Sequence, residues 1–151
     1  MKYIYITLLL ATMNSFWQLV KVDYADANQK LEGFFAKAQK ANPKKIGIIV
    51  LPAWMGIDAH AKESAEALAK LGYHAFVADI YGVGNNPKNT GEAGKNAGFY
   101  KNNPAEYQKR IQLAIDQLVK AGADKNQIAV IGYCFGGTGA IEAARGNLNV
   151  K

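Results

Sequence analysis

The sequence predicts one α/β domain in which a mainly parallel sheet is flanked by helices. From residue 46 onward, short apolar runs typical of buried strands alternate with segments whose apolar residues recur at helical spacing. Such alternation favours parallel strands, because a crossover helix is what carries the chain back to start the next strand. The 151 residues suffice for one domain with its own core.

A hairpin is expected before this alternation begins. Residues 19–25 alternate between apolar and polar side chains, turn-forming residues follow at 26–28, and residues 31–36 have the pattern of a returning strand. The unbroken apolar run at residues 46–51 indicates a strand buried on both faces. Further strands are expected over residues 73–79 and 128–133.

Three helices are predicted between and after these strands from their end signals. Asp58 is suited to cap one helix, and Gly72 to end it. Residues 90–100 have a weaker helical pattern, interrupted by glycines. Asn103 followed by Pro104 marks another helix start, with Asn103 as N-cap. That helix places its apolar residues on one face, namely Tyr107, Ile111, Ala114, Ile115 and Leu118.

The strongest chemical signal is a G-x-C-x-G segment between a strand and an Ala-rich helical stretch. It consists of Gly132, Cys134 and Gly136, and it is the pattern of a nucleophile elbow with Cys at its apex. The turn is so tight that side chains two positions either side would collide with backbone. The helix that follows points its N-terminus at the thiol, which favours the thiolate. A lone Cys is more often a small buried apolar residue, but packing alone does not require both glycines.

Three motifs in consistent order resemble the dienelactone hydrolase family of α/β-hydrolases, and the resemblance extends from about residue 19 to the end. They are Gly-Tyr-Cys-Phe-Gly-Gly at 132–137, Ala-Trp-Met-Gly at 53–56, and Leu-Gly-Tyr-His-Ala-Phe-Val-Ala-Asp-Ile-Tyr-Gly at 71–82. The resemblance implies hydrolysis of a carboxylic ester or lactone. It assigns Cys134 as the nucleophile, and the backbone N–H groups of Trp54 and Phe135 as the oxyanion hole that stabilises charge on the carbonyl oxygen.

The chain departs from the family pattern in two places. Many members carry a Glu that hydrogen-bonds the resting thiol, and Ala53 stands at that position. The family triad continues with Asp and then His after the nucleophile, but residues 135–151 contain neither. We therefore expect residues 19–151 to form a partial α/β-hydrolase domain, truncated after the elbow helix and inactive alone.

Few other residues are candidates for the site. His60, which follows the cap Asp58, could lie near its mouth, whereas His74 should lie at the opposite end of the sheet. Histidines at such positions more often have a structural role or lie at the surface than act in catalysis. Asp79 could face the site, although an Asp at a strand end more often caps a turn. Three aromatic residues could shape a pocket: Tyr81, Phe99 and Tyr100.

Other function classes are less well supported. A degenerate, non-catalytic hydrolase domain that acts as a binding module is the alternative to an enzyme. Gly82 and Gly84 lack the third glycine of a dinucleotide fingerprint, and there is no GK[ST] phosphate loop. A glutamine amidotransferase usually has Gln where Thr138 stands.

The composition of the chain limits the classes of partner that it is expected to bind. The net charge of +6 comes from 16 Lys and 2 Arg scattered along the chain, without the clusters typical of nucleic-acid binding. The single Cys excludes an intrachain disulfide. We expect a small ester or lactone as substrate, and no cofactor, metal, nucleic acid or membrane span.

Both ends of the chain suggest further properties. Residues 1–18 contain an apolar run too short to span a membrane, which suits a signal peptide or an N-terminal extension. This favours export to the periplasm, with a cytoplasmic protein as the alternative. Residues 128–131 are apolar on both faces, as in a central strand. We expect the far edge of that strand to be unpaired and to allow self-association.

Overall fold

The computed structural model describes residues 19–151, so the expected signal peptide or extension at residues 1–18 lies outside the described residues. The elements in chain order are β1 (Val20–Asp26), β2 (Gln29–Ala36), β3 (Gly47–Leu51), α1 (Ala59–Leu71), β4 (His74–Val77), α2 (Thr90–Asn102), α3 (Pro104–Lys120), β5 (Ile128–Gly132) and α4 (Phe135–Arg145). Within residues 19–151, no helix is long and apolar enough to cross a membrane.

The strands form one mixed sheet in the order β1-β2-β4-β3-β5. β3 lies between β4 and β5 and is parallel to both, whereas β2 is antiparallel to β1 and to β4. The α/β class is therefore confirmed, and so is the hairpin before it. The antiparallel part of the sheet is this N-terminal hairpin, which is joined to the parallel part along β4.

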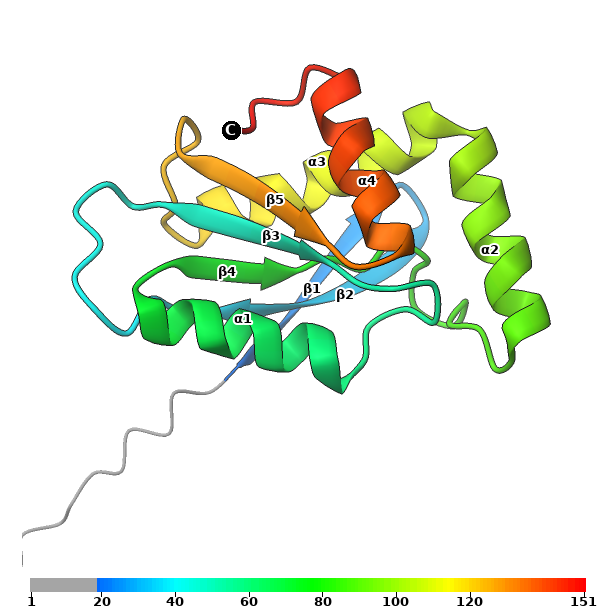
Figure 1. The fold of residues 1–151 in the computed structure, drawn as a ribbon, viewed down its shortest axis with the longest axis horizontal. Helices are drawn as coiled ribbons and strands as arrows, with labels where there is room; N and C mark the ends of the chain where they lie inside the picture. Colours follow the sequence, from blue (N-terminus) through cyan, green and yellow to red (C-terminus); the bar gives the residue numbers. More distant parts are fainter. Residues whose placement is uncertain (1–18) are drawn as a thin grey trace, which may run out of the picture.

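Helices cover both faces of the sheet (Figure 1). α1 packs on one face against β4, β3 and β2, and its buried Ala61, Ala65 and Ala69 form a core layer with Val50 and Val77. α3 and α4 pack on the other face, and α2 lies beside α3.

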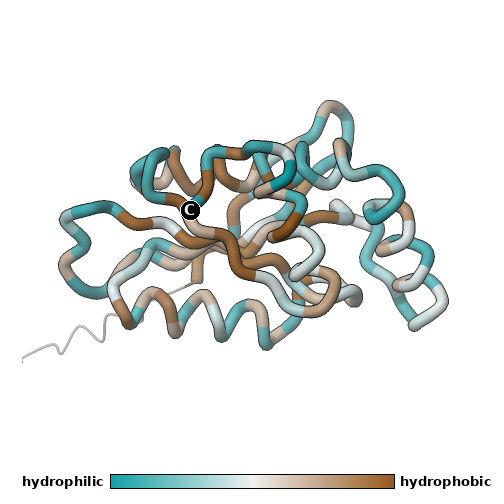
Figure 2. The backbone as a smooth tube through the Cα atoms, turned by 45° about the horizontal axis from the view of Figure 1, so that its top comes forward, coloured by the Kyte–Doolittle hydropathy of each residue, from teal (hydrophilic) through white to brown (hydrophobic). Residues whose placement is uncertain are grey.

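The main core lies between the sheet and α3. All five residues predicted to share one face of α3 are buried there, and they pack with residues of β3, β4 and β5. The hydropathy of the backbone follows this arrangement, since hydrophobic residues concentrate along the strands and hydrophilic ones along α2 (Figure 2). Burial of each Leu, Ile or Phe side chain stabilises the fold by about 1.5–3 kcal/mol.

The helix ends follow local capping chemistry, with one difference from the prediction. Asp58 accepts a hydrogen bond from the N–H of Ala61, and Gly72 ends α1 in a left-handed conformation with φ 105°. Asn103 does not cap α3 with its side chain, which instead donates to the carbonyl of Phe99 at the end of α2. The amide thus closes the preceding helix, because its own backbone conformation does not present the side chain to the α3 amides.

α2 is a complete helix of 13 residues despite its glycines. Asn89 accepts a hydrogen bond from the N–H of Glu92, and the Glu92 carboxylate accepts one from the N–H of Lys88. This reciprocal arrangement satisfies N–H groups that a helix start leaves without partners. Packing of Ala93, Ala97 and Tyr100 into the molecule adds to this stabilisation.

Ion pairs and hydrogen bonds fasten the hairpin to the rest of the molecule. Asp26, at the end of β1, is buried and lies 2.6 Å from Lys109 Nζ and 3.1 Å from Arg110 Nε on α3. Arg110 Nε and Nη1 are buried without an aligned hydrogen bond, so the short Nε–Oδ2 distance describes an ion pair of poor angle. Within residues 19–151, Asp26 is the acidic side chain that lies within 4 Å of Arg110, so it is the main counter-charge of this guanidinium.

Candidate active site

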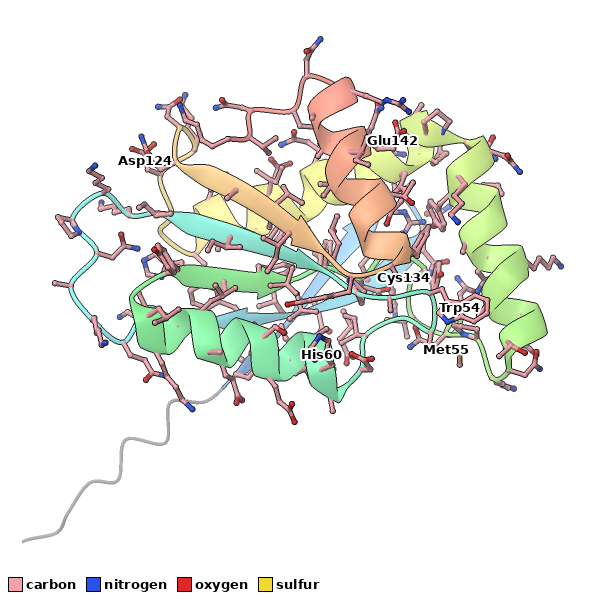
Figure 3. The ribbon with its side chains drawn as sticks, viewed as in Figure 1. Trp54, Met55, His60, Asp124, Cys134 and Glu142 are labelled. Atoms are coloured by element: carbon pink, nitrogen blue, oxygen red, sulfur yellow. The ribbon has the colours of Figure 1, made fainter. Side chains whose placement is uncertain are left out.

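Cys134 occupies the turn between β5 and α4 in a conformation that side chains rarely adopt. Its φ is 53° and its ψ is −109°, which places it in the left-handed half of conformational space. The turn is held by hydrogen bonds from the Gly136 N–H to the Tyr133 carbonyl (2.8 Å) and from the Gly137 N–H to the Cys134 carbonyl (3.0 Å). Cys134 is exposed (Figure 3). Strain of this kind persists only where the surrounding structure enforces it.

The two glycines that flank this turn are sterically required. A β-carbon on Gly132 would overlap the backbone carbonyl of Gly136, and one on Gly136 would overlap the backbone carbonyl of Leu51. Neither obstacle is a flexible side chain, so neither can move aside cheaply. The steric reason inferred from the sequence for the G-x-C-x-G spacing is therefore present in the structure.

The loop after β3 begins at the same edge of the sheet as this turn. Leu51, the last residue of β3, is in register with Gly132, the last residue of β5. The loop then forms a turn closed by the Gly56 N–H, which donates to the Ala53 carbonyl at 3.0 Å. In the view of Figure 3, Trp54 and Met55 of this turn lie between Cys134 and α2.

The amides of Trp54 and Phe135 are both available at this edge. Within residues 19–151, neither N–H group donates a hydrogen bond to another protein group. For Phe135 the reason is its place as the first residue of α4, where N–H groups have no partner inside the helix.

An aromatic stack supports both segments. The ring of Phe135 lies between Tyr107 and Tyr81, with ring centroids 4.8 Å and 5.7 Å away and interplanar angles of 12° and 20°. The Tyr107 hydroxyl donates to the Phe135 carbonyl at 3.1 Å, and the Tyr81 hydroxyl donates to the Trp54 carbonyl at 2.9 Å. Burial, then the neighbouring Tyr100 and Cys134, raise the pKa of Tyr81, so its hydroxyl stays protonated.

A cleft of about 430 Å³ adjoins the stack between the loop after β4 and α2. The aromatic residues that line the cleft are Tyr81, Phe99 and Tyr100, the three that the sequence suggested for a pocket. Asn and charged side chains form the rest of the lining. Tyr81 thus forms a wall of the cleft and also contacts the Trp54 loop.

The two histidines lie apart from each other. His60 lies in the first turn of α1, where its ring packs edge-on against that of Tyr133, with 4.5 Å between the ring centroids. His74 starts β4, and its Nδ1 accepts a hydrogen bond from the Ala38 N–H at 3.3 Å. The parallel register pairs His74 with Gly47 at the start of β3, so it lies at the opposite end of the sheet from Cys134, as expected.

Asp79 is engaged in holding a turn rather than facing Cys134. Its carboxylate accepts hydrogen bonds from the N–H groups of Glu32 (3.0 Å) and Gly82 (2.8 Å). Burial raises its pKa, and the bonds from these N–H groups act in the opposite direction. The turn-capping alternative named from the sequence is therefore the one that the structure supports.

Two supporting residues were not identified from the sequence. Tyr107 counted only as one of the apolar residues of α3, although its hydroxyl reaches the Phe135 carbonyl. Ser64 went unnoticed, although its hydroxyl accepts a hydrogen bond from Tyr133 at 3.1 Å. The role of Tyr107 could have been inferred from the sequence, since a tyrosine on a buried helix face needs a partner for its hydroxyl. No sequence pattern indicates the role of Ser64.

The mixed sheet, the helices on both faces and the strand–turn–helix around Cys134 define an α/β protein of the hydrolase type. Residues 31–151 match the dienelactone hydrolase family, and the chain belongs to that family. One sequence relative is a probable 2-oxo-3-(5-oxofuran-2-ylidene)propanoate lactonase from Bradyrhizobium sp.. The two are 29% identical over 99 residues, which are 65% of this chain and 40% of the relative.

Solved structures show the same fold. A protein named m3DLH superposes with a TM-score of 0.81 at 30% identity, over 88% of this chain and 56% of that one. A dienelactone hydrolase-like promiscuous phosphotriesterase from metagenomic libraries has a TM-score of 0.81 at 31% identity, over 89% and 56%. An acylaminoacyl peptidase from Pyrococcus horikoshii shares the fold alone, with a TM-score of 0.63 and 16% identity over 87% and 22%. The chain thus spans about half the length of the first two structures.

Proposed function

We propose that this protein presents the nucleophile and the oxyanion donors for the cleavage of carboxylic esters or lactones. The observation that carries the proposal is Cys134, an exposed thiol in a left-handed conformation between two glycines that must be glycine. Backbone strain at an exposed nucleophile is characteristic of functional sites. Membership in the dienelactone hydrolase family supports the same reaction class.

The proposed reaction begins with attack by the Cys134 thiolate on the substrate carbonyl carbon. A sulfur–carbon bond forms, and the carbonyl electron pair moves to the oxygen, where the N–H groups of Trp54 and Phe135 donate to it. When the intermediate collapses, the carbon–oxygen bond to the alcohol breaks and the alkoxide takes a proton from solvent. The product on the protein is a thioester, which water must hydrolyse to release the acid and restore the thiol.

The second half of this cycle needs a general base, and neither histidine hydrogen-bonds the Cys134 thiol within residues 19–151. His74 lies at the other end of the sheet, and the His60 ring packs on Tyr133. Ala53 offers no functional group that could hold the thiol. We therefore propose that the 151-residue protein stops at the thioester and does not turn over at an enzymatic rate.

The cleft beside Tyr81 is the proposed place for the part of the substrate that does not react. Its volume of about 430 Å³ lies within the range of small-molecule sites. Phe99 and Tyr100 offer it aromatic surface, and polar and charged side chains complete its lining.

The test is acylation of the purified protein by p-nitrophenyl acetate, followed by intact-mass spectrometry. We expect one acetyl group per chain on Cys134, with release of about one equivalent of p-nitrophenol in a burst. Cys134→Ala should abolish the burst. The acylation rate of the folded protein should exceed that of N-acetylcysteine at the same pH.

Other results would contradict the proposal. Acylation no faster than that of the free thiol would favour the alternative of a non-catalytic binding module. Repeated turnover that is lost in His60→Ala would show that His60 serves as the base. Acylation of lysines with Cys134 unmodified would also rule out the assigned nucleophile.

A further inference from the structure

Tyr81 contacts both segments that present the proposed oxyanion donors. Its hydroxyl donates to the Trp54 carbonyl at 2.9 Å, and its ring stacks on Phe135 at 5.7 Å between centroids. Residues 54 and 135 lie far apart in the sequence, and Tyr81 follows a third strand, β4. It therefore connects the loop after β3 with the start of α4.

The Trp54 carbonyl has no other donor within residues 19–151. The turn that contains it is closed by the bond from the Gly56 N–H to the Ala53 carbonyl, and that carbonyl belongs to the same planar peptide group as the Trp54 N–H. The bond within the turn therefore sets the direction of the Trp54 N–H relative to the turn. The Tyr81 hydroxyl holds the turn as a unit next to the ring that stacks on Phe135.

Phe135 is fixed more firmly than Trp54. Its ring is buried between two tyrosines, its carbonyl accepts from Tyr107, and it starts a regular helix. The Trp54 side chain, in contrast, is 38% exposed. The placement of the turn that carries the Trp54 N–H therefore depends more on a single hydrogen bond than the placement of Phe135 does.

We infer that Tyr81 is a positioning residue, whose hydroxyl holds the turn of residues 53–56 in place so that the N–H groups of Trp54 and Phe135 point to one oxygen beside Cys134. This inference rests on the proposed function. It predicts that the Tyr81 hydroxyl matters for reactions that place negative charge on a substrate oxygen. It also predicts that the hydroxyl does not matter for thiol reactions that form no such charge.

Two reactions of the same thiol separate these cases. Acylation by p-nitrophenyl acetate passes through an oxyanion, whereas alkylation by iodoacetamide displaces iodide at carbon and forms none. In Tyr81→Phe, the ring stack remains and only the hydroxyl is lost. We expect acylation to slow about tenfold, as for loss of one net hydrogen bond. We expect alkylation to stay within about twofold and the unfolding temperature to stay close to that of the wild type.

A second measurement does not depend on activity. Amide hydrogen exchange of residues 53–56, followed by NMR, should be faster in Tyr81→Phe, because the turn loses its anchor. Tyr73→Phe is the control, since Tyr73 lies just before the other end of β4 and its hydroxyl makes no hydrogen bond within residues 19–151. This control should change neither the acylation rate nor the exchange.

Each outcome decides the inference. Equal loss of acylation and alkylation would show that Tyr81 acts through access to the thiol, and unchanged acylation with unchanged exchange would show that it does not position Trp54. Both results overturn the inference while the proposed function stands. Wild-type acylation no faster than that of N-acetylcysteine would instead refute the proposed function, and the exchange of residues 53–56 would still decide whether Tyr81 holds the turn.

Discussion

Gly136, in the first turn of α4, lies directly against the backbone carbonyl of Leu51 at the end of β3. This approach brings the start of the helix onto the strand that precedes the Trp54 loop. The turn at Cys134 and the loop after β3 are therefore built against each other, and not merely placed at the same sheet edge.

Gly136→Ala should be strongly destabilising. The added β-carbon would overlap rigid backbone, so either β3 or α4 must move, and we expect a loss of about 3 kcal/mol or more in the free energy of unfolding. Urea denaturation gives the value. Gly98→Ala in α2 is the control, because its β-carbon meets nothing within 4 Å, and it should stabilise the protein by about 0.5–1 kcal/mol. Equal effects of the two changes would contradict the steric argument.

Asp26→Asn should test the attachment of the hairpin to α3. The change removes the counter-charge of Arg110, which is 9% exposed, and leaves a buried cation unpaired. Such a loss costs about 3–5 kcal/mol. Lys109→Ala removes the other partner of Asp26, but the Lys109 side chain is 53% exposed, so we expect about 0–1 kcal/mol. Urea denaturation of both variants would refute the assignment if Lys109→Ala were the more damaging.

His74 should make the stability of the fold depend on pH. Burial, and then the charges of Lys37 and Lys45, lower its pKa below the usual value of 6.5. The unfolded state therefore binds the proton more readily, so the contribution of His74 is complete above pH 6.5 and is lost as the pH falls through its folded-state pKa. Protonation would also compete with the hydrogen bond that Nδ1 accepts from the Ala38 N–H.

The measurement is the unfolding free energy of wild type and His74→Gln between pH 8 and pH 5. The difference between the two proteins should shrink as the pH falls, and contributions of other groups such as Asp79 cancel in it. Lys37→Gln should weaken this pH dependence, because Lys37 lowers the pKa of His74 more than Lys45 does. A difference that grows toward pH 5 would give the wrong sign and contradict the assignment.

The sequence predicted the parts of this fold that depend on local chemistry. The caps Asp58 and Gly72 act as expected, because each requirement lies within one turn of helix. The conformation of Cys134 was predictable for the same reason, since two nearby glycines are explained only by a tight turn. The resemblance to the dienelactone hydrolase family then supplied the sheet to which these local elements belong.

The contacts between distant segments could not be predicted in this way. Tyr81 hydrogen-bonds Trp54, and Tyr107 hydrogen-bonds Phe135, across 27 and 28 residues of sequence. Hydrophobic periodicity does not indicate which distant residues form such pairs. The complete α2 helix was also underestimated, because its three glycines lower intrinsic helix propensity while the Asn89 and Glu92 cap offsets part of that loss. Tertiary packing of Ala97 and Tyr100 supplies further stabilisation that the local sequence does not express.

The edge of β5 leads to a last prediction, that the 151-residue protein associates with itself. Within the described residues, β5 pairs only with β3. On the other edge of β5, the Lys151 N–H donates a hydrogen bond to the carbonyl of Ile128, the first residue of the strand. A half-exposed apolar strand with unpaired backbone groups favours pairing with a second chain. Sedimentation velocity should show dimers or larger species, and Val130→Lys should shift them toward monomer because a charged edge residue opposes pairing. Ile141→Lys is the control, since Ile141 is 58% exposed on α4 away from the strand itself. A monomer at all concentrations, or dissociation by Ile141→Lys alone, would show that the β5 edge is not the contact.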